Sequence, residues 1–369
     1  MQKDQSDITL VTPNAPISAP THGGRAKCLQ RLVRLELPVP KTVALSFDVV
    51  HGIAANQMPD IGQILDHFDP DALLCVRPSS ESIDWGGPKA ILNIGMNQAR
   101  FSALSETLGT EAAAKVYYWF IQAYSIHVAR LDPEIFDHIQ GQGQAALEAA
   151  LRAYEEETEE VFPQARSVQL AEVLRSMARA WGGTTARLLR QAKGAPVDAG
   201  LGLVVQKMAF GVGRGECGSG VLQLVDSDTG QPNVVGRYRR QSQGRYGLSD
   251  NDGVMYLTRD KRGPSLEEAV PDILKTLQEQ ATLMRQRLRE EMQIEFTIED
   301  GNLHILDGIR APRRASAALR IAVSLAKSGV ISKQEALLRI EPRSLGELLH
   351  RQVHPDANRD VLAQAVAAS

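Results

Sequence analysis

The sequence predicts an α/β protein in which a long helical segment separates two strand-bearing regions. Three observations lead to this prediction. Short buried runs alternate with a helical pattern between residues 42 and 76, no convincing strand occurs in 111–191, and apolar residues recur with period two from residue 201. A chain of 369 residues accommodates two or three packed units.

The elements of the first region follow from these patterns. We expect residues 1–20, which are polar and proline-bearing, to form a loose tail. A helical pattern then runs from Gly24 to about Leu35, and Pro38 ends it. The remaining elements are expected as strands over 42–47 and 72–76 with a helix over 61–68 between them.

The rest of the chain divides into a helical insert, a second set of strands and closing helices. The insert carries helical periodicity over residues 117–126, 145–157 and 170–181. Glycine-rich turns separate expected strands over 201–210, 220–226, 233–239 and 254–258. A long helix is expected over 265–290, then a hairpin of 294–298 and 303–306, and finally helices over 314–327, 333–339 and 345–350.

Composition excludes several classes of protein. The net charge of -3 provides no general attraction to nucleic acid or to anionic lipid. The three cysteines form no CxxC pair and indicate neither a zinc site nor a disulfide framework. No apolar run is long enough for a membrane span, so we expect a cytoplasmic protein without a membrane partner.

Several strings in the right order resemble one family. They are Gly23-Gly24-Arg25-Ala26 with Leu37-Pro38-Val39-Pro40, Leu73-Leu74-Cys75-Val76-Arg77 with Ile91-Leu92-Asn93-Ile94-Gly95, and Met292-Gln293-Ile294-Glu295-Phe296-Thr297-Ile298-Glu299. Together they resemble the N-terminal nucleotide-binding domain of pyruvate phosphate dikinases. The resemblance implies an ATP-grasp fold, with a first lobe over 21–105, a helical insert over 106–194, a second lobe over 195–310 and a helical segment over 311–369.

The resemblance also implies a site for ATP and Mg²⁺. The positions that match nucleotide-binding residues of the family are Arg25, Arg77, Gln206, Lys207, Met208, the lid glycines Gly213 and Gly215, and Glu295. Glu295 and Asp307 are the implied magnesium ligands. They share a face if the hairpin loop has three residues, whereas a two-residue turn places Glu295 opposite Leu306.

The chain departs from the family pattern at positions that phosphoryl transfer requires. Arg25 stands in place of a lysine, Gln293 in place of an aspartate, Asp307 in place of a glutamine and Ile309 in place of an arginine. The family also carries its transferred phosphoryl group on a histidine domain and delivers it to a pyruvate-binding barrel, and we expect both to be missing from this chain.

These departures favour a catalytically impaired nucleotide-binding or regulatory subunit, a pseudoenzyme without confident catalytic residues and without dikinase activity of its own. One alternative is an active kinase subunit that phosphorylates a histidine domain on a separate chain, and another is an interaction scaffold without nucleotide. A basic and aromatic cluster, Arg237 to Arg240 with Arg245 and Tyr246, raises the possibility of a nucleic-acid partner. We favour an ordinary basic surface there, so the expected partners are a nucleotide and a protein.

Overall fold

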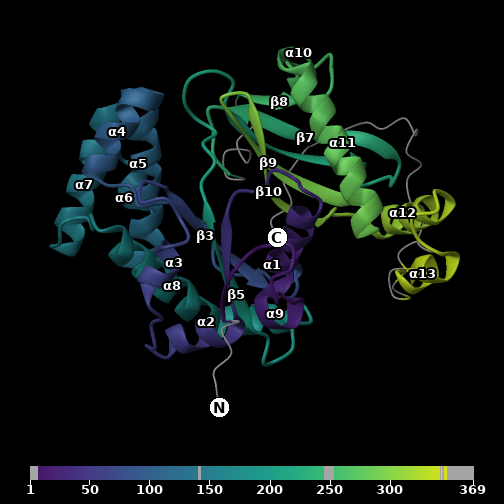
Figure 1. Ribbon diagram of the computed structural model, residues 1–369, viewed down its shortest axis with the longest axis horizontal. Helices are drawn as coiled ribbons and strands as arrows, with labels where there is room; N and C mark the ends of the chain where they lie inside the picture. Colours follow the sequence, from purple (N-terminus) through teal and green to yellow (C-terminus); the bar gives the residue numbers. More distant parts are fainter. Residues whose placement is uncertain (1–6, 140–142, 245–252, 341, 343–344, 347–369) are drawn as a thin grey trace, which may run out of the picture. The chain divides into compact units, whose positions relative to one another are not determined.

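A computed structural model describes residues 7–139, 143–244, 253–340, 342 and 345–346. The chain divides into two compact units, of which the first comprises residues 1–224 and 234–311 and the second residues 225–233 and 312–369. The fold is α/β, as predicted, with two sheets in the first unit and helices between and around them (Figure 1). None of the described helices is both long and apolar enough to cross a membrane.

The first sheet has the strand order β1-β2-β5-β3-β4, and its neighbouring strands are antiparallel. Its strands are β1 (Ile8–Leu10), β2 (Thr42–Leu45), β3 (Leu74–Ser80), β4 (Ile91–Ile94) and β5 (Leu201–Lys207). The central strand β5 is buried from Leu201 to Gln206, because helices cover the sheet. Short helices α2 (Phe47–Ala54), α3 (Ile61–Leu65) and η1 (Ile83–Trp85) connect the strands.

The expected loose tail is wrong from residue 8 onward. Strand β1 pairs with β2, and Val11 and Ile17 beyond it are buried. The three-residue strand is too short to give a period-two signal, and it forms because β2 offers it a sheet edge. Residues 1–6 of the expected tail lie outside the described residues.

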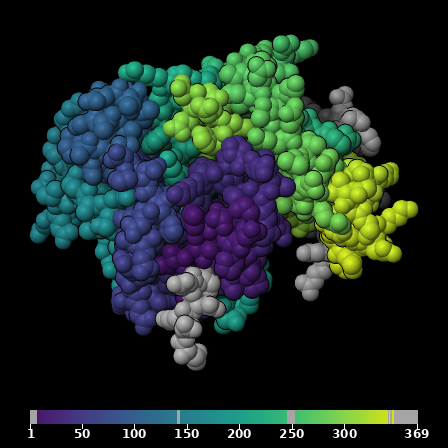
Figure 2. Space-filling view, in the orientation of Figure 1, coloured from purple at the N-terminus to yellow at the C-terminus, as the bar shows by residue number. Residues whose placement is uncertain are grey.

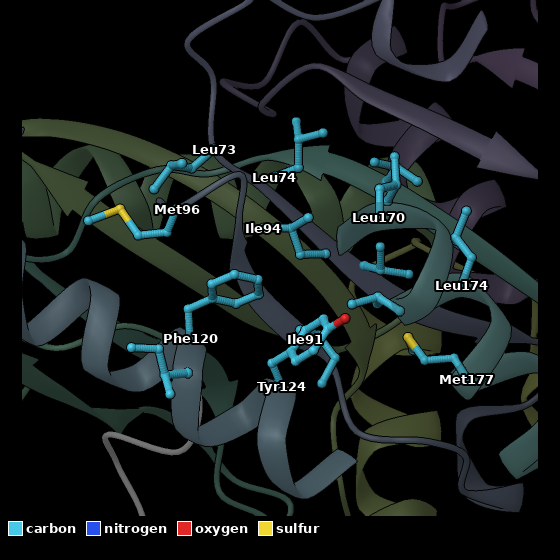
Figure 3. Close-up of a cluster of buried hydrophobic side chains, with 14 of the residues drawn as sticks. Leu73, Leu74, Ile91, Ile94, Met96, Phe120, Tyr124, Leu170, Leu174 and Met177 are labelled. Carbon is cyan, nitrogen blue, oxygen red and sulfur yellow. The ribbon is translucent and has the colours of Figure 1, made fainter. Parts of the chain in front are cut away.

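The segment between β4 and β5 contains helices and no strand among its described residues. Its helices are α4 (Gln98–Leu108), α5 (Thr110–Tyr124), η2 (Ser125–Ala129), α6 (Glu134–Asp137), α7 (Gly143–Thr158), α8 (Arg166–Gly182) and α9 (Thr184–Ala192). Helices α5 and α7 pack side by side, and in the space-filling view the blue and teal atoms of this segment form a continuous surface (Figure 2). Ile94, Phe120 and Leu174 show how β4, α5 and α8 share one core (Figure 3).

The second sheet has the strand order β10-β9-β6-β7-β8. Its strands are β6 (Gly218–Val225), β7 (Pro232–Arg240), β8 (Val254–Tyr256), β9 (Met292–Glu299) and β10 (Asn302–Arg310). The helix expected over 265–290 is two helices, α10 (Leu266–Ala269) and α11 (Pro271–Leu288). The break has a local cause, because Pro271 has no N–H and favours the first turn of a new helix.

Helix α1 (Ala19–Arg34) contacts both sheets, and it carries Arg25. Gly23, with φ of +86°, interrupts it, and a Cβ there would lie 1.7 Å from the Ser79 carbonyl oxygen. Only glycine permits this approach of the helix to β3. The Ser79 hydroxyl fixes the contact by donating to the His22 carbonyl oxygen at 2.6 Å and accepting from the Ala26 N–H at 3.0 Å.

The second unit contains helices α12 (Ala315–Lys327) and α13 (Lys333–Leu338) and the turn between β6 and β7. The Arg314 guanidinium pairs with the Asp228 carboxylate at 2.9 Å, and Arg320 donates to the Thr229 carbonyl oxygen at 3.0 Å. The helix expected over 345–350 falls mostly outside the described residues.

Candidate functional site

A cavity of about 550 Å³ lies between the two sheets of the first unit. Helix α1 contributes Arg25, strand β3 contributes Arg77, and the hairpin contributes Glu295 and Asp307. The cavity also includes the end of β5, from Gln206 to Met208. Seven of the nine predicted site residues therefore meet here, although Arg25 and Asp307 are 282 positions apart in the sequence.

Two arginines and two carboxylates in this cavity form one ion-pair network. The Arg25 Nε donates to Asp307 Oδ2 at 2.7 Å, and the Arg77 Nη2 donates to Glu295 Oε2 at 2.5 Å. Arg77 also lies 3.6 Å from Asp307 Oδ2, so Asp307 links the two pairs. All four side chains are buried or nearly so, and the network is neutral because its two positive and two negative charges cancel.

Backbone groups hold three of these four side chains in place. Arg25 also donates to the Pro78 carbonyl oxygen, and Arg77 donates to the Leu306 carbonyl oxygen at 2.8 Å. The Asp307 Oδ1 accepts from the Gly308 N–H at 2.9 Å. Each arginine therefore joins a carboxylate to a backbone carbonyl, which fixes the orientation of its planar guanidinium.

The electrostatics of the network follow from burial and charge together. Burial would raise the pKa of the Asp307 carboxyl, but the charges of Arg25 and Arg77 outweigh it and hold that pKa below its ordinary value. Burial would likewise lower the pKa of Arg77, and Glu295 and Asp307 outweigh it and raise that pKa. At neutral pH Asp307 and Arg77 therefore both remain charged.

The register of the hairpin differs from either expectation. The turn has two residues, Asp300 and Gly301, both with positive φ, as a type I′ turn requires. The three-residue loop is therefore wrong, yet Glu295 does lie opposite Asp307. A β-bulge between Ile305 and Asp307 shifts the register by one residue and restores this pairing.

The remaining predicted residues have different surroundings. The Gln206 amide donates to the Thr42 hydroxyl at 3.0 Å, and Lys207 pairs with Asp69 at 2.9 Å at the exposed end of β5. The two lid glycines do not line the cavity: Gly213 hydrogen-bonds Gln241 in both directions, and Gly215 packs on Asp300 of the hairpin turn.

The positions that depart from the family pattern are also visible. Ile309 lines the cavity and presents no charge to it. Arg310 lines it too, but its guanidinium lies 3.3 Å from the Glu290 carboxylate. Gln293 bonds with Gln223 of β6 at 3.3 Å and is not among the residues that line the cavity.

Two described residues of the basic and aromatic cluster of β7 have partners within the protein. Tyr238 is fully buried, stacks on Phe296 and donates its hydroxyl to Glu216. Arg240 pairs with the same Glu216 at 2.7 Å. Arg245 and Tyr246 lie outside the described residues.

Sequence reasoning missed that the expected ligands contact one another. It assigned Arg25 and Arg77 to phosphates and Glu295 and Asp307 to magnesium, whereas the structure joins them in pairs. One signal was present: Arg25 and Asp307 are both departures from the family pattern, and they are the two residues that pair.

Comparison with known proteins places this arrangement in a family. The chain is 28% identical to the pyruvate, phosphate dikinase of Rhizobium meliloti (strain 1021) and matches it over 94% of its own length and 43% of the relative's. It is 30% identical to the enzyme of that name from Clostridium symbiosum, over 82% of the chain and 36% of the relative. The chloroplastic enzyme of Flaveria trinervia is 25% identical over 94% of the chain and 40% of the relative. No protein-family model matches the chain.

The chain thus spans about two fifths of the length of the relatives that it matches. The fold, the cavity and these relatives together define a nucleotide-binding domain of the ATP-grasp type. The chain belongs to the pyruvate, phosphate dikinase family, of which it represents the N-terminal region.

Proposed function

We propose that this chain binds ATP in the cavity between its two sheets and is impaired in phosphoryl transfer, so that it acts as a nucleotide-binding or regulatory subunit. The observation that carries the proposal is the neutral ion-pair network of Arg25, Arg77, Glu295 and Asp307. In the absence of ligand, this network already neutralises the charges on which both phosphate binding and metal binding depend.

An exchange of partners reconciles the network with nucleotide binding. When a triphosphate enters, Arg25 and Arg77 can transfer from their carboxylates to phosphate oxygens, for which a guanidinium is well suited. Glu295 and Asp307 then offer oxygen ligands to Mg²⁺, which commonly takes one or two carboxylates together with phosphates. All four charged side chains keep a partner only if the triphosphate and Mg²⁺ enter together. We therefore expect Mg²⁺ to bind with the nucleotide and not alone.

These two carboxylates fit magnesium by their chemistry and by their position on neighbouring strands. When bound, the ion would neutralise phosphate charge. The protein's own part is to hold the carboxylates in register through the β-bulge and to hold the two arginines near the phosphates. The lobes of the ATP-grasp fold would be residues 21–105 and 195–310, with strand β1 added to the sheet of the first lobe, the helical insert over 106–194 and the closing helices over 311–369.

Impairment of catalysis is supported by two positions at which the chain departs from the family pattern. Ile309 offers no charge to a transferring phosphoryl group, and Gln293 is turned to Gln223. Loss of one charge-stabilising contact in a transition state typically costs about 2.7 to 4 kcal/mol, so loss of more than one reduces transfer by several orders of magnitude. Nucleotide affinity depends on fewer of these positions.

Titration calorimetry tests the binding. ATP, ADP, AMP and GTP are titrated into the full chain with and without Mg²⁺, and we expect ATP to bind and Mg²⁺ to strengthen its binding. The double variant Arg25→Ala, Arg77→Ala should lose most of this affinity. Unchanged affinity in that variant would falsify the placement, and the absence of any nucleotide binding would favour an interaction scaffold instead.

An active phosphotransferase subunit is the second candidate, and one observation favours it. The carboxylate that the chain lacks at Gln293 is replaced by Asp307 on the next strand, opposite Glu295, so an acidic pair is retained. Incubation with radiolabelled ATP and a separate histidine domain distinguishes the two candidates. Little phosphohistidine is expected, with partial recovery in the triple variant Gln293→Asp, Asp307→Gln, Ile309→Arg, whereas rapid labelling by the unaltered chain would establish the active subunit.

A cytoplasmic location completes the proposal. Cys28, Cys75 and Cys217 are free thiols, which suits a reducing compartment. Partner proteins, including one that carries a phosphohistidine domain, belong to the proposal as well. The labelling experiment above is their direct test.

A further inference from the structure

The cavity between the two sheets has two ends of different character. At one end, strand β5 leads into the apolar Met208 and Ala209, which line the cavity. Strand β3 passes Arg77 and leads into the loop of residues 81–90. Because β3 and β5 are antiparallel, their last residues lie at opposite ends of this strand pair. The apolar end suits a nucleobase, which leaves the loop end for the phosphates.

The loop of residues 81–90 carries two adjacent glycines beside the phosphate-binding arginines. Gly86 and Gly87 both line the cavity. A Cβ on Gly87 would lie 3.4 Å from the Pro78 side chain, and the carbonyl oxygen of Pro78 accepts a hydrogen bond from Arg25. The glycines are therefore separated from the Arg25 guanidinium by a single residue, Pro78.

A lysine of the helical insert reaches this loop from outside the cavity. Helix α9 ends at Ala192, and Lys193 follows it directly. A Cβ on Gly86 would lie 3.9 Å from the Lys193 Nζ, and apart from the two chain neighbours of Gly86 no other described atom would lie within 4 Å of it. A side chain at position 86 would thus point toward the ammonium, whereas glycine leaves the space between them open.

Several cations that line the cavity already have a carboxylate partner, whereas Lys193 has none among the described residues. The paired cations, each within 3.3 Å of a carboxylate oxygen, are Arg25, Arg77, Lys207 and Arg310. Lys193 is exposed, and its ammonium makes no ion pair or hydrogen bond with any residue that the structure describes. A phosphate can bind Lys193 without displacing a carboxylate, so its contact is not offset by the loss of an ion pair.

We propose that Lys193 determines the specificity of the ATP site for the triphosphate, because its ammonium binds the terminal phosphate beside Gly86. This role rests on the proposed function, since it requires ATP in the cavity. A compact ammonium on a flexible stem suits a phosphate at the edge of the cavity, which it can approach from outside. ADP held by the same base contacts and by Arg25 and Arg77 lacks the phosphate that extends to the loop. Lys193 therefore favours ATP over ADP, as a regulatory subunit that responds to ATP requires.

Titration calorimetry on the full chain tests this role, with ATP and ADP as ligands in the presence of Mg²⁺. Lys193→Gln should weaken the binding of ATP about tenfold, because it removes a charge-assisted contact, and should change the binding of ADP by about twofold or less. Lys193→Arg should retain most of the preference for ATP, because it keeps the charge. Lys193 is exposed and unpaired, so Lys193→Gln should unfold at the same urea concentration as the parent.

Arg187→Gln is the matched control for the general positive charge of helix α9. Arg187 is an exposed cation of the same helix and does not line the cavity. Its removal changes the net charge as much as Lys193→Gln does, but it removes no contact beside Gly86. The affinities for ATP and ADP should therefore stay at the parent values. An equal loss of ATP affinity in both variants would overturn the contact with the terminal phosphate, because a long-range field would explain it.

The remaining outcomes separate the role of Lys193 from the ATP site itself. Equal affinity for ATP in the parent and in Lys193→Gln would overturn this role and leave the ATP site in place. An equal loss of affinity for ATP and ADP would overturn the specificity, because Lys193 would then contact a phosphate that both nucleotides share. Absence of ATP binding by the parent chain would contradict the proposed function, and the role of Lys193 would fall with it.

Discussion

Two cavities of the first unit, the one between the sheets and one of about 510 Å³ beside the helical insert, share the lining residues Leu92 and Gln243 but differ in the charged residues that line them. In the cavity between the sheets, Arg25 and Arg77 each have a carboxylate and a backbone carbonyl oxygen as partners. In the cavity beside the helical insert, Lys115 and Arg239 lie near each other without an acidic residue among the described lining.

This difference separates two uses of buried charge. The closed network of ion pairs stabilises the ligand-free fold and must be opened before a ligand binds. Lys115 of the second cavity is not part of that network and donates to the Gln241 carbonyl oxygen. We therefore expect substitutions in the first cavity to change stability more than those in the second. The predictions below are arranged by the size of that effect.

The largest loss of stability should follow removal of Asp307, because its side chain is only 3% exposed and it contacts both arginines. Asp307→Ala leaves two buried guanidiniums without their shared partner, and breaking a buried pair from one side typically costs about 3 to 5 kcal/mol. Urea denaturation at neutral pH measures the loss. Lys115→Ala is the control from the second cavity, and an equal loss in both variants would contradict the distinction drawn between the cavities.

A smaller effect is expected when the family's own pair is restored. Asp307→Gln alone removes the carboxylate that pairs with Arg25, and Arg25→Lys alone removes the hydrogen bond from Nε. The double variant places a lysine beside an amide. A double-mutant cycle should give a coupling free energy of about 1 to 3 kcal/mol between the two positions. A coupling free energy near zero would indicate that the Arg25 and Asp307 pair contributes nothing specific to the network.

The sequence motifs predict most of the first cavity but not the pairing of its charged side chains. The strings around Gly23, Arg77 and Glu295 located most of the cavity, since motif residues in one family converge in space. The pairing of Arg25 with Asp307 spans 282 residues, and no periodicity in the sequence encodes a contact of that separation. The one signal of the pair in the sequence is that both positions depart from the family pattern.

The fold, like the site, is predictable from the sequence only in part. The hairpin turn follows from Asp300-Gly301, because both residues tolerate positive φ, but the β-bulge that sets the register beyond it has no signal in the residues around Leu306. The break before Pro271 follows from the rule that a helix usually ends before a proline, although the helical periodicity continues across it. Strand β1 was too short to detect.

Acid should weaken the network through Asp307. Its pKa in the folded protein lies below its unfolded value of about 3.9, so its ionisation stabilises the fold above that pH and the stabilisation is lost as pH falls through the folded pKa. Below about pH 4, the parent chain should therefore lose stability more steeply than Asp307→Asn, which has no carboxylate at this position to protonate. Denaturation midpoints at successive pH values measure both slopes, and parallel slopes would exclude Asp307 as a source of the acid sensitivity.

The smallest effect is expected at the mouth of the first cavity, where Lys207 pairs with Asp69. The Asp69 carboxylate is 73% exposed and its pKa is lowered by the hydrogen bond from Lys207, yet water and salt screen a pair in this position. Lys207→Gln should leave the denaturation midpoint unchanged within error, at low and at high salt. The N···O distance is 2.9 Å between Lys207 and Asp69 and 2.7 Å between Arg25 and Asp307. Because these distances are similar, the comparison tests the effect of burial. A midpoint that shifts in Lys207→Gln as far as in Asp307→Ala would show that distance, and not burial, governs what an ion pair contributes in this protein.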